Sequence, residues 1–206
     1  MPLHPLTAAD LELILPWRNA PAVRRAMVSH HEISPAEHRA WFQRLSQDPR
    51  ACWYLFQDAA DQPQGVVYFT ALDPAQGTAC WGFYAKPDAT PGTGTRLLYE
   101  ALDLAFGELA LHKLNGEALA SNSASVNLHK KVGFTQEGVF RAQHFDGQDR
   151  LDIVRLGMLA EEWPPHRERL RARIAARAHP RDPHRGRRAG RQRCHLRPAL
   201  AGVPGP

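Results

Sequence analysis

The chain has few of the residues and segments that mark membrane, secreted and metal-binding proteins. Its 206 residues include three cysteines, and no two of them form a Cys-x-x-Cys pair. This sparse, odd-numbered set argues against disulfide bonds and structural zinc, and it favours a reducing cytoplasm. No apolar run approaches the ~20 residues of a membrane-spanning helix. The N-terminus lacks a charged region followed by an apolar one, so we expect no signal peptide.

Acidic residues are scarce near the C-terminus. From Pro164 to Pro206 the chain carries twelve Arg, no Lys and only Glu168 and Asp182 as acids, a local excess of +10. Because the whole chain carries +5, residues 1–163 carry −5. The segment also has seven Pro and few large apolar residues, so it cannot bury enough surface to fold alone. We predict one folded domain over 1–163 and a disordered tail over 164–206, in which 167–178 can extend the last element as a helix.

The apolar pattern of the domain predicts two helical segments, three strands, and then helix, strand, helix and two strands. Thr7 and Ser34 each start a helix with an acidic residue three positions later, and Pro16 is expected to kink or end the first helix. This order is typical of an α+β fold with a mixed, mostly antiparallel sheet flanked by helices. The predicted helices are 7–19, 34–46, 95–109 and 122–132, with a short turn at 23–28, and the predicted strands are 52–56, 65–70, 78–86, 112–119, 136–145 and 152–159.

A Gly/Thr/Pro loop separates the aromatic strand at Trp81 from the amphipathic helix that contains Phe106. Gly92 and Gly94 permit a close backbone approach, and a helix beginning near Thr95 adds free N–H groups and the positive end of its dipole. Such a loop binds a phosphate or pyrophosphate. It is neither a Walker loop nor a dinucleotide fingerprint. A strand-to-helix turn without a ligand uses glycine in the same way, so the loop alone leaves both interpretations open.

A second motif follows at residues 122–134, where Asn122 and Ser125 start a helix and Gly133 ends it. Together the two stretches resemble the GNAT acyl-CoA N-acetyltransferases. The resemblance implies that the strand before the loop pairs with the pantetheine arm of acetyl-CoA, that the loop holds the pyrophosphate, and that 122–134 flanks the thioester. This chain has Ala89 where the family usually has Gln or Arg, and His129 where it usually has Tyr.

The donor-binding residues that this resemblance implies lie on the strand, the loop and the second motif. They are Phe83, Tyr84, Ala85, Gly92, Thr93, Gly94, Thr95, Arg96, Asn122, Ser125 and Lys130.

Two further phrases narrow the resemblance. Residues 17–27 read WRN-x-P-x-V-R-x-x-M, and residues 31–42 read HEIS-x-x-EH-x-x-WF. With the motifs above they look like the PseH type of GNAT enzyme, which N-acetylates the 4-amino group of a UDP-linked 4-amino-4,6-dideoxy-N-acetyl-altrosamine in pseudaminic acid synthesis. The resemblance covers nearly all of 1–163 and none of the tail. It implies a UDP-amino-sugar acceptor and direct transfer in a ternary complex.

The chemistry needs a neutral amine, a stabilised oxyanion and a protonated leaving thiol. Glu117 is the only carboxylate between His112 and Gln136, and we expect it to be the general base; otherwise it is an exposed strand carboxylate. The oxyanion donor is expected among the backbone N–H groups of residues 83–85, which makes Tyr84 a catalytic candidate. His129 is a candidate general acid, or else a histidine that packs on the cofactor.

The acceptor contacts have two interpretations each. Met27, Trp41, Trp81 and Tyr84 form an apolar wall for uracil and sugar, or they belong to the core. His31 and its neighbours bind diphosphate or sugar hydroxyls, or they form a helix-entry loop. Arg18 and Arg24 meet the UDP phosphates or pair with acids, and no metal site is expected at residues 30, 31 and 38.

Two rival functions remain open. The LHKKVGF segment at 128–134 also resembles the RimJ/RimL protein N-terminal acetyltransferases, although the phrase at 31–42 argues against that acceptor. The Arg-rich tail permits a nucleic-acid-binding module, but no aromatic residues alternate with its Arg, which favours a solvated extension. A homodimer through sheet edges is a further possibility.

Overall fold

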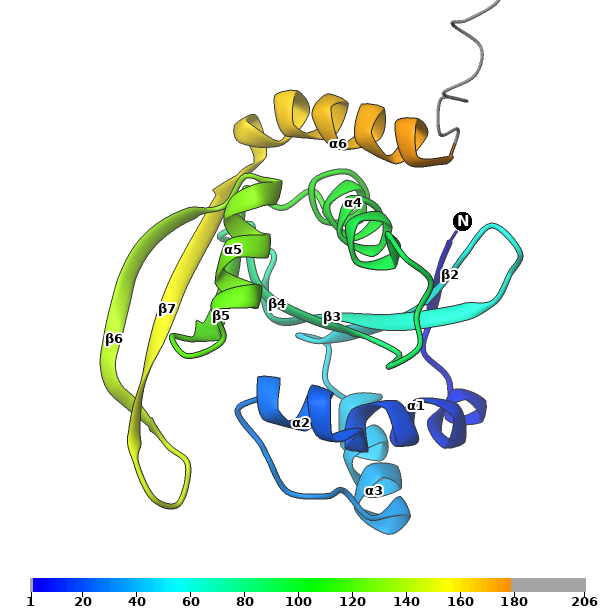
Figure 1. The fold of residues 1–206 in the computed structure, drawn as a ribbon, viewed down its shortest axis with the longest axis vertical. Helices are drawn as coiled ribbons and strands as arrows, with labels where there is room; N and C mark the ends of the chain where they lie inside the picture. The colour runs from blue at the N-terminus through cyan, green and yellow to red at the C-terminus, as the bar shows by residue number, and fades with distance from the viewer. Residues whose placement is uncertain (1, 179–206) are drawn as a thin grey trace, which may run out of the picture.

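A single mixed sheet organises the protein, as a computed structural model describes it over residues 2–178. Its seven strands follow the order β1-β2-β3-β4-β5-β7-β6, and every neighbouring pair is antiparallel except β4 and β5, which are parallel (Figure 1). The strands are β1 (Leu3–Pro5), β2 (Cys52–Gln57), β3 (Pro63–Asp73), β4 (Thr78–Ala85), β5 (Lys113–Leu119), β6 (Thr135–Phe145) and β7 (Arg150–Leu159).

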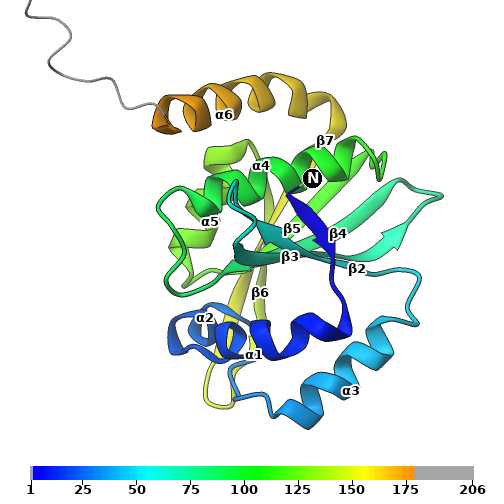
Figure 2. The same cartoon turned by 90° about the vertical axis from the view of Figure 1, so that its right-hand side faces the viewer.

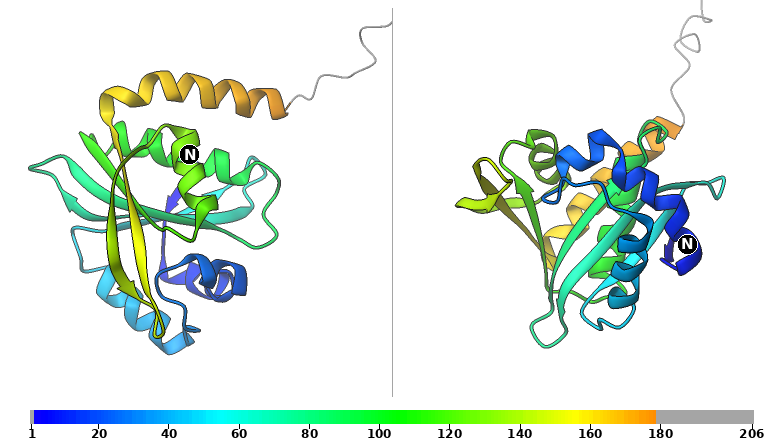
Figure 3. Two further views of the ribbon diagram at one scale, coloured as in Figure 1. Left: turned by 60° about the vertical axis from the view of Figure 1, so that its left-hand side comes forward. Right: turned by 90° about the horizontal axis from the view of Figure 1, so that it is seen from below.

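Helices cover the two faces of the sheet in two groups (Figures 1 and 2). One face carries α1 (Leu11–Asn19), α2 (Pro21–Ala26) and α3 (Pro35–Leu45), and the other carries α4 (Thr93–Phe106), α5 (Ser123–Val132) and α6 (Trp163–Ala178). Short 3-10 turns at Ala8–Asp10 and Ala160–Glu162 precede α1 and α6. Most of the buried side chains lie between the sheet and α4 to α6, and a smaller core lies under α1 to α3. The β6–β7 hairpin extends past the sheet on the side of α1 to α3 (Figure 3).

Local sequence explains where the first helices begin. Asp10 accepts hydrogen bonds from the N–H and hydroxyl of Thr7, at 2.8 and 2.7 Å, and Ser34 accepts the N–H of Glu37 at 3.2 Å. α1 continues through Pro16 to Asn19 rather than ending at the proline. The side-chain amide of Asn19 accepts from Ile33 N–H and donates to Ile33 C=O, so it ties the end of α1 to the segment before α3.

The predicted order of elements is confirmed, with boundaries that differ by a few residues. Strand β1 was not predicted, because its three residues, of which the last is Pro5, are too few for a period-two pattern. Among residues 2–178, no helix combines the length and the apolar character needed to cross a membrane.

The C-terminal boundary differs from the prediction. α6 packs on α4, where the Trp163 indole and the Arg167 guanidinium both donate to the Asp103 carboxylate, Arg167 with bonds of 2.6 and 2.9 Å to the two oxygens. Leu170 is buried between the helices. The expected disorder is therefore wrong for 164–178, and the helix considered for 167–178 is present. The rest of the predicted tail lies outside the described residues.

Candidate active site

The parallel strands β4 and β5 separate partway along their length. Their register runs from Thr78 and Lys113 to Trp81 and Gly116 and then ends. Beyond it, Gly82–Ala85 pairs with β3 alone and Glu117–Leu119 with β7 alone. We call these two diverging segments the β4/β5 split. Backbone groups on the facing edges of the split need hydrogen-bond partners, and an extended ligand can supply them.

The N-terminus of α4 follows directly after β4 and is open to an anion. Gly92 caps it in the left-handed conformation, with φ of 93°. Thr93 N–H donates back to Thr90 C=O at 3.0 Å, and Gly94 and Thr95 occupy the next positions of the first turn. A Cβ placed on Gly94 would meet nothing within 4 Å. This end of a fourteen-residue helix therefore presents N–H groups and a positive dipole to open space, which fits a pyrophosphate.

A buried amide holds the loop before α4 in place. Gln64 of β3 accepts the N–H of Thr90 at its side-chain oxygen, at 3.3 Å, and its backbone carbonyl accepts Lys86 N–H at 2.9 Å. The Gln64 side-chain nitrogen donates to Asp58 at 2.7 Å. The loop therefore has a fixed conformation before any ligand binds, which lowers the entropic cost of binding.

His129 lies on α5 beside the split and is 3% exposed. Its Nδ1 donates to Ser125 C=O at 2.8 Å, so Nε2 carries the lone pair of a neutral ring. Burial lowers the pKa of His129, which favours this neutral form. A proton is thus missing from the nitrogen that a general acid would use, and the structure does not favour the expected acid role.

Trp81 and His129 meet over Gly116. A Cβ on Gly116 would lie 2.8 Å from His129 Nε2 and 3.0 Å from Trp81 Nε1, so only glycine admits both rings. Trp81 stacks on Phe134 with ring centroids 5.2 Å apart, and its buried Nε1 has no hydrogen-bond partner within residues 2–178. This unpaired donor lies where the split begins, so a bound ligand can satisfy it.

Glu117 is the first residue of β5 beyond its pairing with β4, and its side chain lies on the face of the sheet that carries α1 to α3. Its neighbours Leu114 and Ala118 point into the opposite core, and its Oε1 accepts a 2.6 Å hydrogen bond from Arg155 Nη1 of β7. Arg155 Nη1 also lies 3.8 Å from Cys80 Sγ on β4. The Glu117 side chain is 44% exposed, so it can reach a substrate amine or a water molecule.

Aromatic side chains cross the same face next to β4. The ring of Tyr68 covers Gly82, and Trp53 stacks on Tyr68 with ring centroids 4.0 Å apart. Trp41 of α3 meets Trp53 edge to face at 4.7 Å. The phenol of Tyr84 lies in the small core, where burial raises its pKa, so only its backbone remains a candidate for contact with the donor.

Arg18 of α1 and Arg24 of α2 carry buried guanidinium nitrogens that have no hydrogen-bond partner among residues 2–178. Arg18 Nη2 donates to Ser29 C=O at 3.0 Å, whereas its Nη1 is buried without a partner among the described residues. Burial raises the pKa of Tyr68 and of Tyr84, and the positive charge of Arg18 near these phenols opposes that rise. Arg24 Nε is also buried and has no partner in the part of the chain that the structure describes, and Arg24 Nη1 lies 3.5 Å from Glu32. Buried donors without partners are costly, so an anionic ligand fits here.

The structure brings the expected acceptor residues together only in part. Met27 and Trp41 pack against the same small core as Tyr84. Trp81 belongs to the core on the opposite face, so the expected wall that joined it to them is wrong. His31 is exposed and forms a 2.7 Å hydrogen bond with Glu37, as a helix-entry loop does.

The remaining donor candidates keep the predicted places. Phe83 is half-buried beside Trp81 and His129, and Ala85 ends β4. Asn122 caps α5 by accepting Ser125 N–H at 3.1 Å, and its amide lies 3.4 Å from Ala26 C=O of α2. Arg96 lies in the first turns of α4 and Lys130 in the last turn of α5, both exposed or half-exposed.

Sequence patterns did not identify Arg155, Tyr68 and Trp53 as site residues. Each lies in a strand of ordinary composition, and only the register of the sheet brings them next to β4 and β5. Within residues 2–178, no three His, Cys, Asp or Glu side chains are grouped so as to hold a metal ion.

Comparison with known proteins gives consistent matches. Residues 1–135 match the family described as Acetyltransferase (GNAT) domain. Acetyltransferase PseH of Campylobacter jejuni subsp. jejuni serotype O:23/36 (strain 81-176) is 31% identical over 132 residues, which cover 63% of this chain and 80% of that protein. The SPbeta prophage-derived uncharacterized N-acetyltransferase YokL of Bacillus subtilis (strain 168) is 30% identical over 138 residues, which cover 65% of this chain and 76% of that protein.

Solved structures confirm the fold. A spermidine N-acetyltransferase from Vibrio cholerae, solved in complex with CoA and spermine, superimposes with a TM-score of 0.72. The two chains are 23% identical, and the match covers 78% of this chain and 96% of the other.

Proposed function

This chain belongs to the GNAT acetyltransferase family, and from that premise we propose that it acetylates an amine on an anionic, nucleotide-linked amino sugar. Members of this family take the acetyl group from acetyl-CoA, so the chain is an acetyl-CoA-dependent N-acetyltransferase. The proposal therefore concerns the acceptor. A UDP-linked 4-amino sugar is the specific candidate, because the matched relative is named PseH and the phrases at 17–27 and 31–42 are typical of that type.

The observation that carries this proposal is the pair of unpartnered guanidinium nitrogens on the acceptor face. Arg18 Nη1 and Arg24 Nε are buried donors that a diphosphate can satisfy. Tyr68 near Arg18, and Trp53 stacked on Tyr68, offer aromatic surface to a base or a sugar ring.

A polyamine is the second candidate acceptor, since the fold matches a spermidine N-acetyltransferase. Polycations need several carboxylates that are free to bind them. On this face Glu117 is paired with Arg155 and Glu32 lies near Arg24, while the arginines would repel a positive chain. The charge on this face therefore supports an anionic acceptor over a cationic one.

The chain's own groups divide the chemistry as follows. Acetyl-CoA supplies a thioester, whose carbonyl carbon would be attacked by the amine; the C–S bond then breaks, and CoA leaves as a thiolate that takes a proton from water. Glu117 takes the proton that the amine loses, directly or through water; its Oε1 is held by Arg155, and Oε2 is free of hydrogen bonds from residues 2–178. An N–H on the facing edge of β4, within Gly82–Ala85, would donate to the carbonyl oxygen. His129 packs beside the split, and its Nδ1–H bond to Ser125 C=O leaves Nε2 as a hydrogen-bond acceptor.

Acetyl transfer by the full chain tests the proposal, with CoA release followed as free thiol. The acceptors are a UDP-4-amino-4,6-dideoxy sugar, spermidine and a peptide with a free N-terminus, at matched concentrations. Selective turnover of the sugar nucleotide is expected. Preference for spermidine or for the peptide would overturn the acceptor while leaving the family assignment intact.

Free cysteines at positions 52 and 80 and the use of acetyl-CoA support the cytoplasm as the proposed compartment.

A further inference from the structure

Helix α6 runs antiparallel along α4. Its first turn contacts the C-terminal half of α4, where Trp163 bonds to Asp103 and packs near Phe106. Its later residues Arg171 and Ile174 line a cavity with Arg96 and Tyr99, near the start of α4. The C-terminal half of α6 therefore lies over the end of α4 that opens toward an anion (Figure 2).

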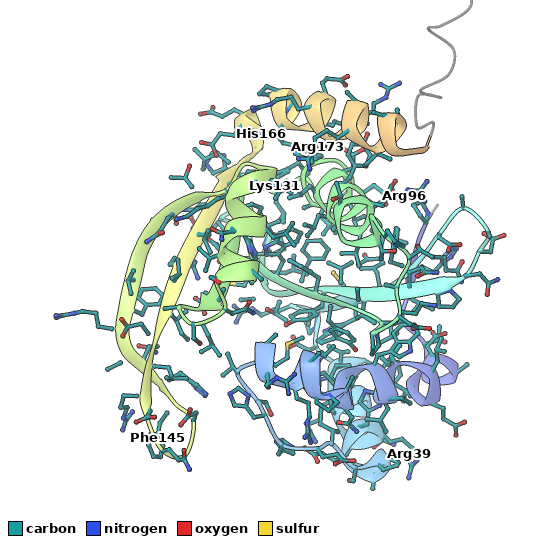
Figure 4. All side chains as sticks on the ribbon, in the orientation of Figure 1. Arg39, Arg96, Lys131, Phe145, His166 and Arg173 are labelled. Carbon is teal, nitrogen blue, oxygen red and sulfur yellow. The ribbon has the colours of Figure 1, made fainter. Side chains whose placement is uncertain are left out.

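One flank of α6 faces α5. A Cβ on Gly133, at the end of α5, would collide with the His166 ring, so His166 lies directly over that residue. Arg173 follows seven residues later, which is two helical turns, and so it shares the flank of His166 about 10 Å closer to the start of α4. Figure 4 labels Arg173, Arg96 and Lys131, one from each of the three helices on this face of the sheet.

Among residues 2–178, Arg173 has no acidic partner, unlike Arg167 and Arg171 on the same helix. Arg167 pairs with Asp103 at 2.6 Å, and Arg171 lies 3.9 Å from Glu168. Within residues 2–178, no carboxylate lies within 4 Å of Arg173 or Arg96, although Arg173 is half-buried. Two unpaired guanidinium groups therefore flank the helix end that fits a pyrophosphate.

We propose that Arg173 of α6 binds the 3′-phosphate of the donor's nucleotide. CoA carries a pyrophosphate and a separate ribose phosphate, and the α4 N-terminus can accept only the first of these. Arg173 overhangs the side of this helix end that faces α5, so a ribose phosphate on that side would meet its guanidinium. A guanidinium binds a phosphate with two parallel hydrogen bonds, so this contact adds affinity and distinguishes CoA from its 3′-dephospho form. The family match ends at residue 135, so α6 adds this contact from outside the matched domain.

Calorimetric binding of CoA and of 3′-dephospho-CoA to the full chain tests the proposal. The wild type is expected to bind CoA more tightly. Arg173→Ala is expected to lower the affinity for CoA about tenfold and to leave the affinity for 3′-dephospho-CoA unchanged, since a hydrogen bond to a charged group is worth about 1.5–3 kcal/mol. Arg171→Ala is the matched control, because it removes the same charge from the other flank of α6, and both affinities should stay at the wild-type value.

Equal weakening of both ligands by Arg173→Ala would mean a general effect and would overturn the proposal, as would an unchanged affinity for CoA. If Arg173→Ala fails to fold, Arg173→Gln and Arg173→Lys replace it. Arg173→Gln should bind CoA and 3′-dephospho-CoA equally, whereas Arg173→Lys should keep part of the preference for CoA. Any other order of the two variants contradicts the assignment. The inference rests on acetyl-CoA as donor and not on the acceptor, so an unexpected acceptor leaves this test unaffected.

Discussion

We propose that the two sides of the catalytic sheet bind their substrates by different means. On the side of α4 to α6, the donor would meet backbone groups: the facing edges of the β4/β5 split and the N–H groups around Gly94. On the side of α1 to α3, the acceptor would meet side chains, chiefly Arg18, Arg24, Trp53 and Tyr68. A donor site built from backbone can tolerate much sequence change, whereas an acceptor site built from side chains sets specificity. The comparison predicts that substitutions on the two sides affect different kinetic constants.

The largest effect is expected at Glu117, where the two sides meet. Glu117→Gln keeps the shape and the contact with Arg155 but cannot take a proton, so kcat should fall about 10²- to 10³-fold, within the range for general bases. The affinity for CoA should stay within about twofold of the wild type, because the donor binds through backbone groups. Steady-state kinetics and calorimetry measure both.

Glu137→Gln is the matched control, since Glu137 is a strand carboxylate paired with Lys113 at 2.6 Å and lies away from the split. A similar loss of kcat in both variants would remove Glu117 from the mechanism.

The next effect separates the acceptor side from the donor side. Arg18→Met should lower kcat/KM for a phosphate-bearing acceptor about 10- to 100-fold, as expected when a hydrogen bond to a charged group worth about 1.5–3 kcal/mol is lost. The KM for acetyl-CoA should not change. Arg25→Met, an exposed arginine one helix away, is the control. If Arg18→Met raised the KM for acetyl-CoA instead, the assignment of this face to the acceptor would be wrong.

Gly94 lies on the donor side, so its substitution should change the affinity for CoA. In Gly94→Ala the new methyl group meets no protein atom, and alanine stabilises a helix by roughly 0.5–1 kcal/mol relative to glycine. The methyl group does intrude where a phosphate approaches the helix end. We therefore expect a slightly higher melting temperature together with a several-fold weaker affinity for CoA.

Gly138→Ala serves for comparison, because a Cβ there also meets nothing within 4 Å, and it should leave CoA binding unchanged. Unaltered CoA affinity in Gly94→Ala would show that the phosphate binds elsewhere.

The smallest effect concerns pH. The folded pKa of His129 is lowered by burial, so its contribution to stability is present above the unfolded value of about 6.5 and is lost as pH falls below it. Burial also lowers the pKa of His38 and His166, so the wild type should lose stability from pH 7.5 to 5.5. His129→Asn, whose amide replaces the Nδ1–H donor, should lose less over that interval. Urea unfolding at both pH values measures the slopes, and identical slopes would show that His129 titrates normally.

The same contrast explains what the sequence predicts and what it does not. Gly92 and Gly94 in one short loop, and Asn122 and Gly133 around one helix, are local features with direct backbone meaning, so the donor side is predictable. The acceptor side joins residues far apart in the chain, such as Glu117 and Arg155, and no periodicity reports that they meet.

Two specific errors have physical causes. Trp81 and Tyr84 are three residues apart on one strand, so they point to opposite faces and cannot form one wall. The Arg-rich composition after Pro164 hides a helix whose few apolar residues, such as Leu170, lie on a single face and pack on α4. Composition averages over a segment, whereas packing depends on the positions of a few residues.

The most direct test of the two-sided account is the binding of uridine diphosphate to protein saturated with CoA, measured by calorimetry for the wild type and Arg18→Met. The account predicts that the wild type binds uridine diphosphate while CoA stays bound, and that Arg18→Met loses this binding with unchanged affinity for CoA. Displacement of CoA by uridine diphosphate, or equal binding by both proteins, would contradict it.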